Sequence, residues 1–158
     1  MFLKLPQKIV KILTKKKLKI SFAESCTGGM LASQITSVSG ASKVFKLGMV
    51  TYSNQAKTDA LHVPKEIIKK YGAVSQECCK IMAKNIQKIG KSHIGVSITG
   101  IAGPRGGGVK KPIGLVYVGI SKYSIFKFKK FLFNKKLSRA EIQRKTCSKT
   151  FKLIQELI

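Results

Sequence analysis

The sequence predicts an α/β protein, a three-layer α/β/α sandwich built around a mixed, mostly parallel sheet. Segments with apolar residues at helical spacing alternate with short apolar, β-prone segments along the chain. Two strand patterns then follow each other late in the chain, just before the last helical segment. Alternating helices and strands are typical of sheets covered on both faces, and a late hairpin adds antiparallel pairing.

The chain is expected to form one domain over residues 1–158. At 158 residues and 44% hydrophobic content, it is long and apolar enough to bury roughly 68–70% of its unfolded surface, so it needs no disulfide or metal to fold. We find no internal repeat, proline-rich linker or low-complexity tract that would divide it.

The first half of the chain predicts three helices and two strands. In order they are a helix over 3–16, a strand over 18–23, a helix that opens at 27–29 and ends near 40, a strand over 47–52 and a helix carrying 57–61. The last of these helices follows Ser53 and Asn54, which are good N-cap residues.

The second half predicts a helix, three strands and a terminal helix. They are a helix from Ser75 to Gly90, strands over 94–99, 113–120 and 123–133, and a helix after Ser138. Ser138 and Glu141 have the spacing of a capping box, which marks the start of that helix.

The charge is strongly basic but evenly spread. There are 31 Lys and Arg against 6 Asp and Glu, which gives a formal net charge of +25. Only Arg105, Arg139 and Arg144 are arginines, and the lysines lie along the whole chain. Because a nucleic-acid site is expected to be a clustered patch, nucleic acid is an unlikely class of partner.

Other classes of site and location are also disfavoured. The four cysteines include the adjacent Cys78 and Cys79, so we expect free thiols rather than a disulfide framework. His62 and His93 are isolated, so no metal site and no cofactor are expected. Lysines interrupt the N-terminal segment, and no apolar run reaches the roughly 18 residues of a membrane span. We therefore expect a cytoplasmic protein without a membrane partner.

The first candidate site segment is the turn after strand 18–23. It places the Ser25 hydroxyl and the Cys26 thiol where a strand turns into a helix. Amides near 28 and 29, or near 100 in the glycine-rich segment, could bind an oxyanion there. The same residue types are also ordinary helix caps. Glu24 either orients this loop or only favours the positive end of the next helix.

Two further segments are expected at the same edge of the sheet, where loops follow strands. Tyr52 and Lys57 flank a strand-to-helix turn, although a lone lysine there is most often solvated. Residues 99–108 form a glycine-rich loop beside Arg105 and Lys110. This loop suits a phosphate, but it has neither a Walker nor a G-x-G-x-x-G pattern and is equally typical of a flexible surface loop.

Taken together, these segments resemble the CinA C-terminal domain family, the nicotinamide-nucleotide amidases that convert nicotinamide mononucleotide to nicotinate mononucleotide and ammonia. The resemblance covers about residues 22–120. It rests on five motifs in the family's order: Ala-Glu-Ser-Cys-Thr-Gly-Gly at 23–29, Val-Thr-Tyr-Ser-Asn-x-x-Lys at 50–57, Tyr-Gly-Ala-Val-Ser at 71–75, Gly-Ile-Ala-Gly-Pro at 100–104 and Lys-Pro-x-Gly at 111–114.

The resemblance implies a serine–lysine amidase with a pyridine nucleotide as its small-molecule partner. Ser25 would be the nucleophile, with Lys57 and Tyr52 as its partners. A lysine base must be unprotonated, and we expect burial to lower its pKa. The residues implied in substrate binding are Thr27, Gly28, Gly29, Asn54, Thr99, Gly100, Ala102, Gly103 and Arg139. A homodimer would follow if Arg139 or Lys135 reached the pocket of a neighbouring copy.

The chain departs from the family before its last helix. Arg139 matches the first arginine of a Phe-x-Gly-x-Arg-x-x-x-Arg pattern, but the glycine is missing and Gln143 takes the place of the second arginine. This departure leaves the phosphate contacts open. Alternatives are an amidase with another substrate, a nucleotide- or nucleic-acid-binding protein of the same fold without activity, and Cys26 as the nucleophile.

Overall fold

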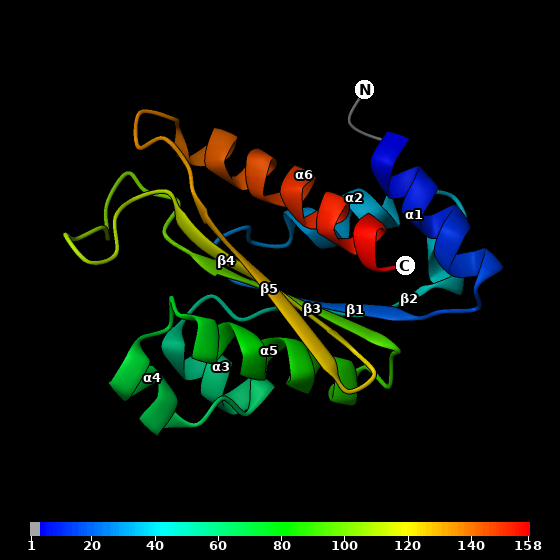
Figure 1. The fold of residues 1–158 in the computed structure, drawn as a ribbon, viewed down its shortest axis with the longest axis horizontal. Helices are drawn as coiled ribbons and strands as arrows, with labels where there is room; N and C mark the ends of the chain where they lie inside the picture. Colours follow the sequence, from blue (N-terminus) through cyan, green and yellow to red (C-terminus); the bar gives the residue numbers. More distant parts are fainter. Residues whose placement is uncertain (1–3) are drawn as a thin grey trace.

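The computed structural model describes residues 4–158, which form one sheet with helices on both faces (Figure 1). The strands are β1 (Ile20–Glu24), β2 (Phe45–Val50), β3 (Ile94–Gly100), β4 (Leu115–Lys122) and β5 (Ile125–Leu132). The helices are α1 (Lys4–Lys15), α2 (Met30–Thr36), the 3₁₀ turn η1 (Ala41–Lys43), α3 (Asn54–Leu61), α4 (Lys65–Tyr71), α5 (Gln76–Ile89) and α6 (Arg139–Leu157).

The sheet has the strand order β2-β1-β3-β4-β5. β1 pairs in parallel with β2 and β3, whereas β4 pairs antiparallel with β3 and β5. All strands except β4 therefore run in one direction. This confirms the predicted α/β class and the mixed, mostly parallel sheet.

Helices cover the two faces of the sheet unequally. In Figure 1, α1, α2 and α6 lie on one face, and α3, α4 and α5 lie on the other. The larger core forms under the first group, where Phe22 and Ile98 point from adjacent strands toward Phe151 of α6. A smaller core on the opposite face includes Ala23 of β1 and Met82 of α5. Successive side chains of β1 thus enter different cores, as strand geometry requires.

Most predicted elements are present, with shifted ends. The predicted helix 3–16 is α1, and its first residue lies outside the described part of the chain. The predicted strand 113–120 begins only at Leu115, because Gly114 has a φ of 91° and belongs to the preceding turn. Helix α4 has no counterpart among the predicted elements, although Pro64 directly before it and Glu66 in its first turn are common helix-start signals.

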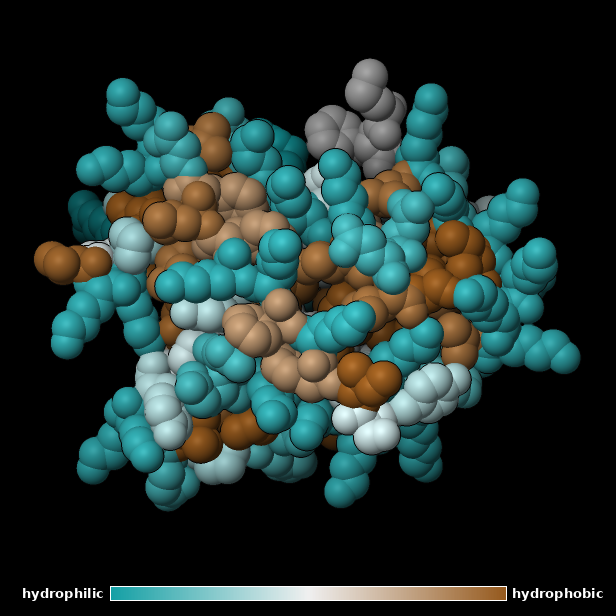
Figure 2. Space-filling model, viewed as in Figure 1, coloured by the Kyte–Doolittle hydropathy of each residue, from teal (hydrophilic) through white to brown (hydrophobic). Residues whose placement is uncertain are grey.

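On the face seen in Figure 2, hydrophilic side chains are distributed over the surface between smaller apolar areas. Within residues 4–158, no helix combines the length and the apolar character needed to cross a membrane.

Helix α5 packs closely on the sheet at Gly95 of β3. A Cβ there would overlap the carbonyl oxygen of Ala83 and would lie 2.8 Å from the backbone nitrogen of Gln87. Both are backbone atoms of α5, so relief would require a shift of the whole helix. Glycine at this position lets α5 approach β3.

We therefore predict that Gly95→Ala lowers the free energy of unfolding by about 2 kcal/mol or more, the range of overpacked core sites. The matched control is Gly108→Ala, because a Cβ at Gly108 has no neighbour within 4 Å. That variant should stay within about 0.5 kcal/mol of wild type. Urea unfolding followed by circular dichroism measures both, and equal stabilities for the two variants would contradict the packing argument.

Candidate active site

The carboxyl ends of β1, β2 and β3 meet at one edge of the sheet, and a cleft of about 250 Å³ opens there. Four segments far apart in the sequence form its walls: the turn after β1, the segment after β2, the glycine-rich loop after β3 and the start of α6. The lining residues are Ser25, Cys26, Tyr52, Gly100, Ile101, Ala102, Gly103, Arg105, Gly106 and Arg139. This is the edge where ligands are expected in layered α/β proteins.

Ser25 directly follows β1, and its side chain continues the strand's alternation between the two faces of the sheet. Its N–H donates to the carbonyl of Ile98 on β3 at 3.0 Å, so its backbone is held as if the ladder went on. Since Ala23 points toward the α5 face, Ser25 points to that face as well. Ser25 as a whole is only 7% exposed, and it is part of the cleft lining.

The side chain of Lys57, which belongs to α3, contacts Ser25. Ser53 caps this helix, accepting from the Ala56 N–H at 3.0 Å, and the cap sets the turn on which Lys57 lies. The Nζ atom of Lys57 lies 2.9 Å from the Ser25 hydroxyl oxygen. Lys57 is only 2% exposed, so its whole side chain runs through the interior.

The surroundings of the Lys57 amine are neutral. Besides Ser25, the amine contacts the carbonyl oxygens of Thr51 at 2.9 Å and of Tyr52 at 3.5 Å. Burial lowers the pKa of Lys57 below its ordinary value, and the nearby thiols of Cys78 and Cys26 oppose this shift more weakly. Burial also raises the pKa of both thiols, to about 11 for Cys78 and about 12 for Cys26. At neutral pH the thiols are therefore uncharged and do not stabilise an ammonium ion.

The three contacts of the amine suit a general base. A neutral amine has two N–H donors, which the carbonyls of Thr51 and Tyr52 can accept, and one lone pair. That lone pair is then left for the hydroxyl proton of Ser25. Lys57 can thus accept this proton, and the same three oxygens can stabilise the ammonium ion that results.

Glu24 anchors the turn from the opposite face of the sheet. Its buried carboxylate accepts from the Thr27 hydroxyl at 2.6 Å and from three backbone N–H groups at the start of α2, those of Gly29, Leu31 and Ala32. Both interpretations of Glu24 from the sequence therefore hold: it orients the loop, and it caps the next helix.

The amides expected to stabilise an oxyanion are already used inside this turn. The N–H of Gly28 donates to the Ser25 carbonyl, and that of Gly29 donates to Glu24. Among residues 4–158, no backbone carbonyl accepts from the N–H of Cys26, Ala102 or Gly103, which all line the cleft. These amides are among the donors available to an oxyanion.

Tyr52 lies at the cleft, but its hydroxyl does not reach Lys57. The side chain is 60% exposed, and its hydroxyl accepts from Arg139 Nη2 at 2.6 Å. Arg139 Nη1 donates to the Gly103 carbonyl at 2.7 Å. Arg139 thus links the segment after β2 to the glycine-rich loop, while only the main chain of Tyr52 contacts the amine.

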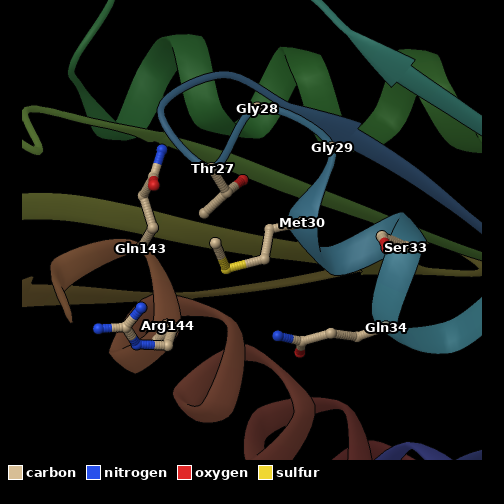
Figure 3. Close-up of a pocket in the computed structure, with 8 residues that line it drawn as sticks. All are labelled: Thr27, Gly28, Gly29, Met30, Ser33, Gln34, Gln143 and Arg144. Carbon is tan, nitrogen blue, oxygen red and sulfur yellow. The ribbon is translucent and has the colours of Figure 1, made fainter. Parts of the chain in front are cut away.

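The structure separates the other predicted binding residues into three places. Gly100, Ala102, Gly103 and Arg139 line the cleft with Ser25. Thr27, Gly28 and Gly29 line a different groove, between α2 and α6 (Figure 3). Neither of the remaining two lines the cleft: Asn54 is exposed at the start of α3, and Thr99 is buried on the α5 face, where its hydroxyl donates to the Ala73 carbonyl at 2.8 Å.

Two contributors to the site were not predicted in their present roles from the sequence. The Thr51 carbonyl holds the Lys57 amine, and a backbone carbonyl is present at every residue. Gln143 donates from its side-chain amide to the Cys26 carbonyl at 2.8 Å. The spacing of Gln143 from Arg139, one helical turn, is the one hint that both face the same turn.

Cys26 is a poor competitor for Ser25. Its pKa of about 12 means that the thiolate, the nucleophilic form, is scarce at neutral pH. Lys57 contacts Ser25 and not the Cys26 sulfur.

Comparison with known proteins identifies relatives over nearly the whole chain. The model of the CinA C-terminal domain family matches residues 3–158. A CinA-like protein of Prochlorococcus marinus (strain AS9601) is 48% identical over 141 residues, which are 88% of this chain and 33% of that protein. The chain thus spans about a third of the length of the curated relatives that it matches.

Solved structures show the same fold. The crystal structure of competence/damage inducible protein CihA from Agrobacterium tumefaciens is 34% identical and matches with a TM-score of 0.96, over 99% of this chain and 94% of that chain. The crystal structure of a CinA superfamily protein from Escherichia coli is 25% identical and matches with a TM-score of 0.95, over 100% of this chain and 91% of that chain.

The burial of the Lys57 amine predicts how the free energy of unfolding changes with pH. In the unfolded chain Lys57 regains its ordinary pKa near 10.5. Between the lowered folded-state pKa and 10.5, the unfolded state binds the extra proton, so wild-type stability rises with pH in that window. Each unit of lowered pKa costs about 1.4 kcal/mol at neutral pH.

Lys57→Met removes this cost, so the variant should melt at a higher temperature than wild type at pH 7, by roughly 2–4 °C for each kcal/mol. The advantage should shrink as the pH approaches 10.5. Thermal melts of both proteins across this range measure it. If wild type is the more stable by a constant margin at every pH, the amine is charged in the folded state.

Proposed function

The chain belongs to the CinA C-terminal domain family, and we propose that its cleft hydrolyses the carboxamide of nicotinamide mononucleotide to nicotinate mononucleotide and ammonia. Ser25 is the nucleophile and Lys57 the general base. The observation that supports this most is the 2.9 Å contact between a buried amine of lowered pKa and a hydroxyl that opens into a cleft. The choice of nicotinamide mononucleotide as the substrate rests on the resemblance of the motifs around these residues to those of the family.

Acylation begins with the Ser25 hydroxyl. Its oxygen attacks the carboxamide carbon while its proton passes to Lys57 Nζ, giving a tetrahedral intermediate with a negatively charged oxygen. Lys57 then donates that proton to the amide nitrogen, the C–N bond breaks, and ammonia leaves an ester on Ser25. The carbonyls of Thr51 and Tyr52 stabilise the transient ammonium.

Deacylation reuses the same base. Lys57, neutral again, takes a proton from a water molecule that attacks the ester, and then returns this proton to the Ser25 oxygen as the ester bond breaks. The product leaves as the carboxylic acid, which loses its remaining proton to solvent and becomes the carboxylate. The free amides of Cys26, Ala102 and Gly103 are the candidate donors to the oxyanion in both steps.

The cleft also favours the charge pattern of this substrate. Its lining contains the guanidinium groups of Arg105 and Arg139 and no carboxylate, which suits a ligand with net negative charge. The exposed ring of Tyr52 offers a face on which the positively charged pyridinium can stack. In this proposal Arg139 fixes the ring through its contact with the phenol oxygen.

The test is ammonia release from nicotinamide mononucleotide by wild type, Ser25→Ala, Lys57→Ala and the control Lys69→Ala, an exposed lysine of α4. We expect the first two variants to lose about a thousandfold or more in kcat, because nucleophile and base act as a unit. The control should match wild type. Undiminished release by Ser25→Ala would refute the mechanism. A folded but inactive wild type would instead favour another amide or a non-enzymatic binding role.

The pH dependence gives a separate check. Because Lys57 must be neutral, kcat/KM should rise about tenfold per pH unit below its pKa and level off above it, with an apparent pKa below 10.5. Measured rates between pH 5 and 10 would show this limb. A profile that is flat across that range would mean that no lysine has to lose its proton.

A further inference from the structure

A second and larger hollow lies beside the turn that bears Ser25. It is a groove of about 650 Å³ between α2 and α6, within the size range of small-molecule sites. In Figure 3, Met30 and Gln34 extend from α2 toward α6, and Gln143 extends from α6 toward the turn. The residues that line it are Thr27, Gly28, Gly29, Met30, Ser33, Gln34, Gln143 and Arg144.

The chemistry of this groove is that of an anion site. Ser33, Gln34 and Gln143 provide hydroxyl and amide donors, Arg144 provides a guanidinium, and no carboxylate is part of the lining. Glu141 lies on the same turn of α6 as Arg144, but its carboxylate already accepts from the backbone and the side chain of Ser138. No hydrogen bond engages the Arg144 guanidinium in the part of the chain from 4 to 158.

We propose that this groove binds a phosphate group, with Arg144 as its cation. A guanidinium presents paired N–H donors to two phosphate oxygens, and the neighbouring hydroxyl and amides can reach the others. Met30 supplies an apolar surface for the organic part of a phosphate ester.

The groove and the Ser25 cleft share the same turn. Gln143 lines the groove while its amide holds the Cys26 carbonyl, and Thr27 lines the groove while its hydroxyl holds Glu24. Arg139 of the cleft and Gln143 of the groove are one turn apart on α6. The phosphate can therefore belong to the nucleotide in the cleft or to a separate molecule that contacts the turn.

Binding of inorganic phosphate tests the site without any turnover, so it does not depend on the proposed function. Isothermal titration at constant ionic strength should show Arg144→Gln weakening the affinity by about tenfold or more, as for the loss of a charged hydrogen bond. Lys145→Gln is the matched control: it removes the same charge from the next residue, which does not line the groove, and should change the affinity less than about twofold. Equal effects of the two variants, or no binding by wild type, would overturn the proposal.

A second titration distinguishes the two sources of the phosphate. The Ser25→Ala protein is saturated with nicotinamide mononucleotide, and phosphate is then added. If phosphate competes with the nucleotide, and Arg144→Gln abolishes this competition, the groove holds the phosphate of the nucleotide. If phosphate and nucleotide bind at the same time, and Arg144→Gln weakens the binding of phosphate, the groove holds free phosphate. Competition that persists unchanged in Arg144→Gln would place the phosphate in the Ser25 cleft and overturn the groove as its site.

Discussion

The arrangement of the site depends on the alternation of side chains at the end of β1. Glu24 and Ser25 are neighbours in sequence, yet strand geometry sends them to opposite faces of the sheet. On one face the Glu24 carboxylate is held by donors from Thr27 and the start of α2. On the other face the Ser25 hydroxyl meets Lys57. A shift of one residue in this strand would exchange the two side chains and leave a carboxylate beside the amine, so the register of β1 fixes the chemistry of the cleft.

The second constraint is the burial of an amine without an acid. Most buried lysines are paired, because an unpaired ammonium in the interior is costly. Here the partners of the Lys57 amine are a hydroxyl and two carbonyls, all of them uncharged, and they satisfy the amine without fixing a proton on it. The surrounding fold has to supply the stability that this position lacks. Burial of apolar side chains supplies stability of this kind, and the larger of the two cores, around Phe22 and Phe151, lies between the sheet and α6.

The sequence predicted well those features that depend on local residues. The caps Ser53, Ser75 and Ser138 mark helix starts in the structure, because a cap is a contact between residues three apart. The Ser25 turn and the glycine-rich loop also lie together, as expected of strands ending at one edge of a sheet. The hydroxyl of Tyr52 could not be placed in the same way, since its partner Arg139 is 87 residues away. Thr99 could not either, because only the register of β3 shows that its side chain faces α5.

Two of the side chains that hold the site together, Arg139 and Gln143, belong to α6, the last segment of the chain described here. During synthesis on the ribosome, the strands and α3 emerge before α6 does. A nascent chain can thus bring Ser25 and Lys57 together while the wall formed by α6 is still missing, and the cleft assumes its shape only when this helix docks. The shape of the cleft therefore depends on the docking of α6, although the contact between Ser25 and Lys57 does not include this helix.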